Sequence, residues 1–195
     1  MKIKICGITN EEDAIKAIDA GVDSLGFVFY KLSKKYIFPE EAEKIIKKLP
    51  PFIKTIGVFA DMEKEEIEDI VKRSKVDMAQ IYFEPQKDFL KQLKIKTIKV
   101  VRVQNKKDLD KYKDDYKIVD SYIPEYGGKG VKVDLSLFNG IDCSKIIIAG
   151  GIEVSDIQKI KKLGFYGIDV SSSVENLPGK KNIQKIKDLV RENKK

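Results

Sequence analysis

Eight short runs of apolar, mostly β-branched residues recur along the chain and predict buried β-strands. They span residues 3–6, 24–29, 53–59, 78–82, 97–103, 117–120, 145–149 and 166–170. Longer stretches rich in Lys and Glu lie between several of these runs, with apolar residues three or four positions apart, at 11–20, 39–49, 63–73 and 154–163. This spacing predicts amphipathic helices. Strand and helix therefore alternate along the chain.

Residues that favour helix ends stand at the edges of the polar stretches. Asn10 and Ser155 are expected to cap helix N-termini, and Pro39 suits a first helical turn. Gly21 and Gly164 follow predicted helices, which is a common position for glycine. These signals support the same alternation.

Alternating strands and helices with short connections predict parallel strands joined by right-handed crossovers. Eight such units predict an α/β protein with one compact (β/α)8 TIM-barrel domain over residues 1–195. An open doubly wound sheet is the alternative fold. The chain is shorter than the roughly 250 residues of a typical barrel, so we expect abbreviated helices. Residues 104–115 contain few apolar positions and predict at most a short helix, and residues 191–195 predict a frayed end.

The charge pattern narrows the class of partner. The 195 residues include 38 basic and 31 acidic ones, and the net charge is +7. The lysines are spread between Glu and Asp residues rather than gathered in a basic stripe, which argues against nucleic-acid binding. Solvated helix faces and a field that favours an anionic ligand explain the charge better. No apolar stretch approaches the roughly 18 residues of a membrane span, and no signal peptide precedes the first strand, so we expect a cytoplasmic protein.

The chain contains no histidine and two cysteines, Cys6 and Cys143. The cysteines form neither a spaced metal pair nor a disulfide framework, and the predicted strands place them at opposite ends of the sheet. Without histidine, acid–base chemistry must come from Cys, Asp, Glu, Lys or Tyr. Cys6, at the end of the first strand, is therefore a candidate proton-transfer group.

The ends of the other predicted strands bring further candidates to the same face, where barrel enzymes hold their active sites. Beside Cys6 these include Tyr30, Gln80, Arg102 and Asp120. Each has a structural alternative. A lone buried cysteine is usually a small hydrophobic residue, and an aspartate at a strand end often forms a turn.

Two loops after the seventh and eighth strands suit a phosphate group. Gly150 and Gly151 let backbone N–H groups approach an anion without an intervening Cβ, although two glycines by themselves can mark only a tight turn. Residues 171–173 are three serines and add further donors. The glycine-rich residues 126–130 after the sixth strand are either a flexible turn or a lid over the substrate.

A series of motifs extends over nearly the whole chain. They are Lys4-Ile-Cys-Gly-Ile-Thr-Asn10, Gly26-Phe-Val-Phe-Tyr30, Ser33-Lys-Lys-Tyr-Ile37, Gly57-Val-Phe59, Asp120, Tyr126-Gly-Gly128, Ala149-Gly-Gly-Ile152 and Asp169-Val-Ser-Ser172, with Val174-Glu175 and Pro178-Gly179. In this order they resemble the motifs of phosphoribosylanthranilate isomerase, and the match is highly specific.

The resemblance implies a (β/α)8 barrel that catalyses the Amadori rearrangement of N-(5-phosphoribosyl)anthranilate to 1-(2-carboxyphenylamino)-1-deoxyribulose 5-phosphate in tryptophan biosynthesis. It implies no metal and no cofactor. Carried over by motif, the general base is Cys6 and the general acid is Asp120. Asp120 must then hold a proton and have a raised pKa. A free thiol has a pKa of about 8.5, so Cys6 needs help from its surroundings, which nearby lysines could supply.

The resemblance also implies substrate-binding residues. The phosphate is expected on Gly150, Gly151, Ser171 and Ser172, chiefly through backbone N–H groups. Ser173 replaces a glycine that is usual in the family, which could slightly shift these contacts.

Two departures affect the rest of the substrate site. Lys35 stands where the family usually has an arginine that holds the anthranilate carboxylate, and it keeps the charge without the bidentate fork. Arg102 is a weaker candidate for that contact. A family Gln-Leu-His-Gly motif here reads Gln80-Ile-Tyr-Phe83, so Gln80 carries over as a substrate-binding residue and Tyr82 replaces the histidine.

Two other functions fit part of the sequence. A ribulose-phosphate epimerase would use similar phosphate loops but usually relies on metal-binding histidines, which are absent. A catalytically silent phosphosugar-binding barrel would keep the glycines, and Lys35 leaves room for it, whereas Cys6 and Asp120 argue against it. The expected partner is a small phosphosugar, with no nucleic acid and no membrane, and a homodimer stays open.

Overall fold

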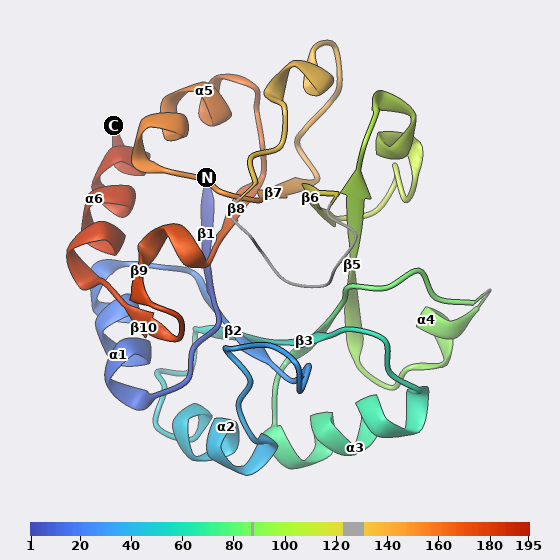
Figure 1. Cartoon of the computed structure of the whole chain (residues 1–195), viewed down its shortest axis with the longest axis vertical. Helices are drawn as coiled ribbons and strands as arrows, with labels where there is room; N and C mark the ends of the chain where they lie inside the picture. The colour runs from blue at the N-terminus through green and yellow to red at the C-terminus, as the bar shows by residue number, and fades with distance from the viewer. Residues whose placement is uncertain (87, 123–130) are drawn as a thin grey trace.

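The computed structural model describes residues 1–86, 88–122 and 131–195. Eight parallel strands close into a barrel in sequence order (Figure 1). They are β1 (Lys2–Cys6), β2 (Ser24–Val28), β3 (Lys54–Phe59), β4 (Met78–Ile81), β5 (Lys96–Val103), β6 (Lys117–Ser121), β7 (Ile146–Ala149) and β8 (Gly167–Val170). Every predicted strand is confirmed to within one residue at either end. Because β1 pairs with β8, the open-sheet alternative is wrong.

The helices cover the outside of the barrel unevenly (Figure 1). The longer ones are α1 (Glu11–Ala20), α2 (Pro39–Ile46), α3 (Lys64–Ser74), α5 (Ile157–Lys162) and α6 (Ile183–Lys194). The shorter elements are α4 (Phe89–Gln92) and the 3-10 turns η1 (Lys106–Asp110), η2 (Leu135–Phe138), η3 (Val154–Asp156) and η4 (Ser172–Val174). A small hairpin of β9 (Glu175–Leu177) and β10 (Lys180–Lys181) follows β8. The expected abbreviation of the helices is confirmed.

Helix ends follow the predicted signals with one exception. The Asn10 side chain accepts the Asp13 backbone N–H at 2.9 Å and caps α1, and Pro39 is the first residue of α2. Ser155 is not a cap. It lies inside η3, where Glu153 forms a capping box with the residue three positions later. The Glu153 backbone N–H donates to the Asp156 Oδ2 at 2.9 Å, so the cap lies two residues before Ser155.

The C-terminal end is ordered rather than frayed, so that prediction is wrong. Helix α6 continues to Lys194, and its apolar face, which includes Ile186, Leu189 and Val190, is buried in the core. The Asn193 side chain also donates to the Met1 carbonyl oxygen at 2.9 Å. Burial of these three side chains anchors α6 as far as Val190, and the Asn193 hydrogen bond holds its last turn against fraying.

Two apolar clusters build the core. The larger one lies between the strands and the helices and includes Ile5, Leu25, Phe27 and Phe59. The smaller one, Ile98, Val100, Ile118 and Ala149, fills the inside of the barrel. Successive strand residues point to opposite faces, so the inward rows that contain this smaller cluster continue toward the strand ends. There they become polar.

Near β5 and β6, where the helices are short, two buried lysines donate hydrogen bonds to carbonyl oxygens of the loops. The Lys99 ammonium donates to the Phe83 carbonyl oxygen, and the Lys117 ammonium donates to the carbonyl oxygens of Leu109 and Lys111. Burial lowers the pKa of Lys99 to about 8 and also lowers that of Lys117. These ammonium groups satisfy loop carbonyls, since buried polar groups without partners are costly.

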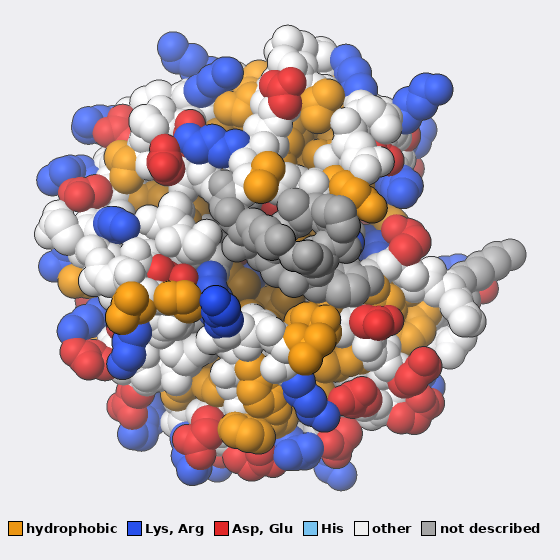
Figure 2. All heavy atoms as spheres, viewed as in Figure 1, with side chains coloured by type: hydrophobic (Ala, Val, Ile, Leu, Met, Phe, Trp, Pro, Cys, Tyr) orange, Lys and Arg blue, Asp and Glu red, His pale blue; other side chains and the backbone are white. Residues whose placement is uncertain are grey.

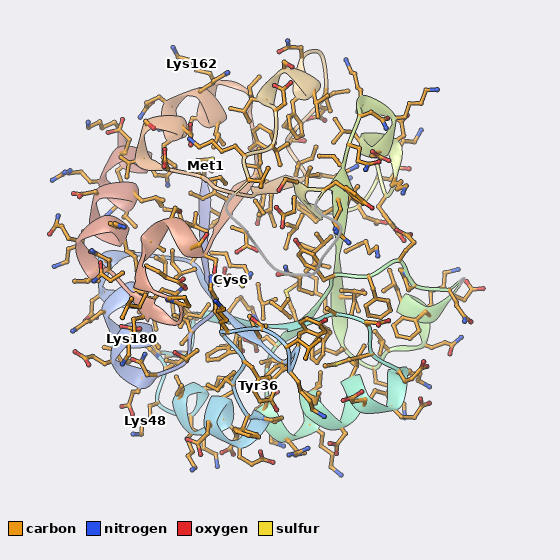
Figure 3. The ribbon with its side chains drawn as sticks, in the orientation of Figure 1. Met1, Cys6, Tyr36, Lys48, Lys162 and Lys180 are labelled. Atoms are coloured by element: carbon orange, nitrogen blue, oxygen red, sulfur yellow. The ribbon has the colours of Figure 1, made fainter. Side chains whose placement is uncertain are left out.

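Charged side chains of both signs are interspersed over the visible face of the molecule (Figure 2). Lys48 and Lys162 lie at the periphery, whereas Cys6 lies near the middle of the ring of strands (Figure 3). None of the described helices is long and apolar enough to cross a membrane.

Candidate active site

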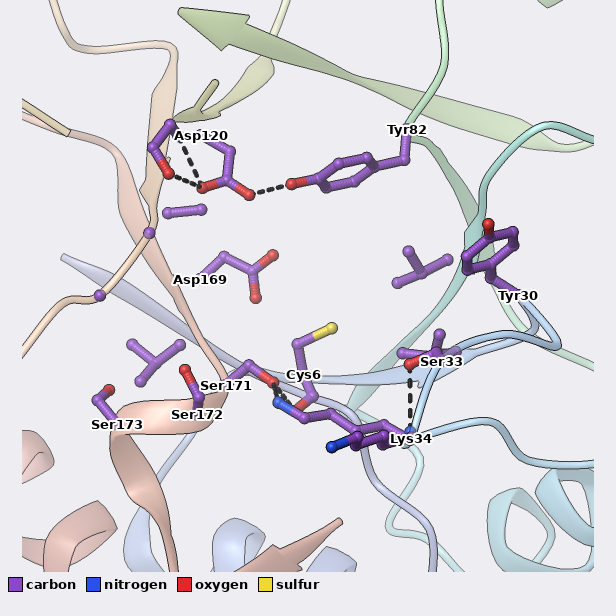
Figure 4. A pocket seen from close by; sticks show the side chains of 18 of the residues that line it. Cys6, Tyr30, Ser33, Lys34, Tyr82, Asp120, Asp169, Ser171, Ser172 and Ser173 are labelled. Atoms are coloured by element: carbon purple, nitrogen blue, oxygen red, sulfur yellow. Dashed lines mark hydrogen bonds between the residues drawn. The ribbon is translucent and has the colours of Figure 1, made fainter. Parts of the chain in front are cut away.

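A cavity of about 460 Å³ opens at the carboxyl ends of the barrel strands (Figure 4). Its lining contains nearly all residues that the sequence placed at strand ends, together with Lys35, which the family resemblance added: Cys6, Tyr30, Lys35, Gln80, Asp120, Gly150, Gly151, Ser171, Ser172 and Ser173. Arg102 is not among the described lining residues. Its guanidinium carbon lies 4.9 Å from the centre of the Tyr122 ring instead. The expectation that these strand ends converge is therefore met for the residues that line the cavity, and the described lining does not include Arg102.

Cys6 shares its surroundings with a buried ion pair. Lys4, two residues earlier on β1, points to the same side of the strand and donates to Asp169 of β8 at 2.8 and 2.9 Å. Only 4 % of the Lys4 side chain and 7 % of the Asp169 side chain are exposed. Burial works to lower the pKa of Lys4, but the charges of Asp169 and of a Cys6 thiolate outweigh it and raise that pKa above its usual value. A thiolate at Cys6 therefore faces an ammonium group that stays charged.

Gly26 on β2 provides the space for this arrangement. A Cβ atom at this position would lie 2.9 Å from the Cys6 Sγ and 3.0 Å from the Lys4 Nζ. Both distances are shorter than ordinary van der Waals contacts. The absence of a side chain at Gly26 thus lets the thiol and the ammonium group approach each other.

Asp120, at the carboxyl end of β6, is 8 % exposed. Its Oδ1 accepts the backbone N–H of Ser121 at 2.8 Å, and its Oδ2 accepts the hydroxyl of Tyr82. Burial disfavours the carboxylate and raises the pKa of Asp120, although the hydrogen bonds from Tyr82 and Ser121 oppose that change. The charge of Asp169 adds to the increase. A carboxyl group in these surroundings holds its proton to a higher pH than an exposed one.

The two loops after β7 and β8 lie side by side at the cavity. Gly150 has a φ of +89° and Gly151 a φ of +56°, and a Cβ atom at Gly150 would lie 2.8 Å from the Asp120 Oδ1. Glycine is therefore required at 150 both for its backbone conformation and for the close approach of Asp120. The Ser173 hydroxyl donates to the Ile152 carbonyl oxygen at 2.6 Å, so the serine that replaces the usual glycine ties the two loops together.

Lys35 lies at the cavity but is already paired. Its ammonium lies 3.1 Å from a carboxylate oxygen of Glu175 and donates to the Ser171 hydroxyl at 2.7 Å. Lys181 donates to the other Glu175 oxygen and to the Cys6 carbonyl oxygen, each at 2.6 Å. Burial lowers the pKa of Lys181, with Glu175 acting in the opposite direction. The two lysines and one glutamate leave a formal charge of +1 beside the cavity.

The Ser171 hydroxyl is also committed within this network. It donates to the Cys6 carbonyl oxygen at 2.9 Å while it accepts from Lys35. Its side chain therefore positions the end of β1, which leaves the backbone N–H as the group of Ser171 that suits an anion.

Gln80 on β4 presents a polar atom to the cavity. The residue is 2 % exposed, and its Oε1 has no hydrogen-bond partner within the described part of the chain. A buried amide oxygen without a partner is unfavourable, so this atom suits a donor on a bound molecule.

Sequence reasoning singled out too few residues here. Lys4, Asp169 and Glu175 lie within the family motifs given above. Their charged side chains in otherwise apolar or small-residue motifs could have identified them as site residues. Tyr82 marks a departure from the family motif, whereas Lys181 has no local signal because it is one of many lysines. The expected lid at residues 126–130 lies outside the described residues. Among the residues that the structure describes, no group of three or more acidic or cysteine side chains is arranged to hold a metal ion.

Enzymes of this fold hold their chemistry at the carboxyl ends of the strands, and that is where the polar groups of this chain are concentrated. The protein is accordingly a (β/α)8-barrel enzyme whose cavity offers acid–base groups and anion donors to a small substrate.

Comparison with known proteins shows to which family of barrel enzymes the chain belongs. The family model for N-(5'phosphoribosyl)anthranilate (PRA) isomerase matches residues 3–192. An N-(5'-phosphoribosyl)anthranilate isomerase from Nitratiruptor sp. is 46 % identical over 100 % of this chain and 99 % of that protein. The crystal structure of the Thermotoga maritima isomerase is similar with a TM-score of 0.91 and 35 % identity, covering 100 % of this chain and 98 % of that one.

A further isomerase structure contains reduced 1-(o-carboxyphenylamino)-1-deoxyribulose 5-phosphate. It has a TM-score of 0.86 and 32 % identity to this chain and covers 100 % of this chain and 98 % of that one. The chain belongs to the N-(5'-phosphoribosyl)anthranilate isomerase family, the intramolecular aldose–ketose isomerases of tryptophan biosynthesis.

Proposed function

We propose that Cys6 is the general base and Asp120 the general acid of the Amadori rearrangement of N-(5-phosphoribosyl)anthranilate. The observation that carries this proposal is that a thiol beside a charged ammonium and a buried carboxyl group with a raised pKa face one cavity. Asp120 donates its proton to the furanose oxygen as the C1–O bond breaks, which leaves a protonated Schiff base. The Cys6 thiolate then removes the C2 proton, and the resulting enolamine tautomerises to the ketone.

The remaining cavity residues bind the substrate. Backbone N–H groups of Gly150, Gly151, Ser171 and Ser172 receive the phosphate, because such groups suit an anion where no Cβ blocks the approach. The amide oxygen of Gln80 accepts a hydrogen bond from the substrate, which gives that buried atom a partner.

Lys35 binds the anthranilate carboxylate, which balances the formal charge of +1 that it shares with Lys181 and Glu175. Its ammonium lies 3.1 Å from a carboxylate oxygen of Glu175. The substrate carboxylate therefore joins or replaces an existing carboxylate partner, and this single point charge lacks the bidentate geometry of an arginine.

Cys6→Ala and Asp120→Asn test the assignment. Each variant should lose at least about 100-fold in kcat, the usual range for one acid or base, while binding of the reduced product analogue stays close to wild type. Cys143→Ala is the matched control, since that thiol lies before β7 at the other end of the barrel and outside the cavity lining. Near-normal turnover in either active-site variant would exclude the mechanism.

Two further measurements complete this test. Because the acid must be protonated, kcat should fall as pH rises through the raised pKa of Asp120, and activity should persist where an ordinary aspartic acid has lost its proton. Restored growth without tryptophan in a host that lacks this isomerase would exclude a silent phosphosugar-binding barrel, and failure by soluble, folded protein would favour it.

We also propose a homodimer that uses the amino-terminal end of the barrel. Phe52 is 95 % exposed and lies beside a cavity that Tyr116 and Tyr166 also line. Exposed aromatic side chains around a hollow are typical of an interface between proteins. The phosphoribosylanthranilate isomerase of Thermotoga maritima, a relative with a solved structure, is dimeric.

A further inference from the structure

Tyr82, the residue that follows β4, and Asp120 on β6 meet across the cavity (Figure 4). Strand β5 lies between β4 and β6 in the barrel. The Tyr82 hydroxyl donates to the Asp120 Oδ2. The mechanism above gives Tyr82 no role, although its side chain is one of the few groups in direct contact with the acid.

The contacts of Asp120 decide which oxygen can carry its proton. Oδ1 already accepts the backbone N–H of Ser121 at 2.8 Å and lies near the Ser121 hydroxyl at 3.5 Å. Gly150 closes in on the same oxygen. The transferable proton is therefore on Oδ2, the oxygen that Tyr82 contacts.

Proton transfer changes the strength of the Tyr82 contact. When Oδ2 gives up its proton to the substrate, negative charge develops on the carboxyl group. A hydrogen bond to a charged acceptor is roughly twice as strong as one between neutral groups, so the hydroxyl stabilises the transition state more than the ground state. A donor that is already in place needs no reorganisation during the reaction.

We propose that Tyr82 is a positioning residue for the acid step. Its hydroxyl holds the Asp120 carboxyl group with Oδ2 toward the substrate and stabilises the carboxylate that forms as the proton leaves. The proposal rests on the role of Asp120 given under Proposed function.

Charged groups on the neighbouring strands set the background for this pair. Burial is the largest influence and raises the pKa of both residues. Asp169 on β8 raises both values further, and Arg102 on β5 lowers that of Tyr82. Lys4 on β1 is hydrogen-bonded to Asp169. The described lining residues of β7 and the loop after it, Ala149, Gly150, Gly151 and Ile152, carry no charge. None of these groups is altered when the Tyr82 hydroxyl is removed.

Tyr82→Phe is the test, because it removes the hydroxyl and keeps the ring that fills the cavity wall. We expect kcat to fall by about 10- to 100-fold, as for a lost hydrogen bond to a charged group, with KM nearly unchanged. The carboxyl group of Asp120 should titrate at higher pH, since a donor that favours its charged form is gone. Carbon-13 NMR of the carboxyl groups measures this titration, and the signal missing in Asp120→Asn identifies Asp120.

Tyr112→Phe is the matched control. It also removes a hydrogen bond from a tyrosine hydroxyl to a carboxylate, at 3.1 Å to Glu84, but outside the cavity lining. Its kcat should stay within about twofold of wild type, since a single exposed hydrogen bond contributes little.

The outcomes separate this proposal from the one on which it rests. An unchanged kcat or an unmoved Asp120 titration in Tyr82→Phe overturns the role of Tyr82, even if Asp120→Asn is inactive. Normal turnover in Asp120→Asn overturns the role of Asp120 itself. A lower kcat together with a shifted titration, in a variant whose thermal unfolding matches wild type, supports the positioning role.

Discussion

Replacing Lys4 with methionine tests two roles of this residue: stabilising the Cys6 thiolate and stabilising the folded barrel. Lys4 and Asp169 form a buried pair at 2.8 Å, and both side chains are almost fully excluded from solvent. Removing one partner of such a pair leaves an uncompensated charge and costs about 3–5 kcal/mol of unfolding free energy. Methionine keeps the length of the side chain and adapts to irregular space. The loss of unfolding free energy therefore comes from the unpaired charge of Asp169 rather than from a cavity.

The double variant Lys4→Met/Asp169→Asn distinguishes the two effects. It removes the stranded carboxylate, so we expect it to regain most of the stability lost in Lys4→Met. The ammonium beside Cys6 is still missing. Alkylation of Cys6 by iodoacetamide at fixed pH should therefore be slower than in wild type in both variants, because the thiolate is the reactive form.

Chemical denaturation measures the stability, and the alkylation rate measures the thiolate. Both are best determined in a Cys143→Ala background. Burial raises the pKa of Cys143 to about 11, which keeps its own reaction slow, and its removal makes the signal specific for Cys6. A loss of less than about 1 kcal/mol in Lys4→Met would contradict the buried-pair argument. An alkylation rate equal to wild type in either variant would show that Lys4 does not support the thiolate.

Two further predictions address the packing of the site and the proposed dimer. Gly26→Ala should lower kcat by about 10-fold or more and change the unfolding temperature little, because its Cβ would lie 2.9 Å from the Cys6 Sγ and displace the reacting atom. Steady-state kinetics and thermal unfolding measure the two effects. An unchanged kcat would mean that the space at Gly26 is not needed. Phe52→Glu should convert the protein to monomers in analytical ultracentrifugation because it places a charge at the apolar contact. Leu177→Glu, at the opposite end of the barrel, is its control, and an equal effect of both changes would refute the proposed interface.

The apolar pattern was sufficient to predict the strands because barrel strands are buried on both faces and read as short continuous apolar runs. Helix boundaries were harder. Residues 39–49 have a helical spacing to the end, yet α2 stops at Ile46, and Ser155 gave way to Glu153 at the next cap. The end of the chain was mistaken for a frayed segment, since its order depends on burial against the rest of the barrel rather than on local sequence.

The sequence by itself determined where the strands lie along the chain and the positions of Cys6 and Asp120 at strand ends, because a run of apolar residues is a local property of the sequence. Only the tertiary structure decided which groups surround them. Lys4 and Asp169 are 165 positions apart in the chain and meet because β1 pairs with β8 when the barrel closes. Tyr82 reaches Asp120 across 38 positions in the same way. The protonation and orientation of the proposed acid and base depend on these distant partners, since burial and neighbouring charge set a pKa and only the folded barrel provides both.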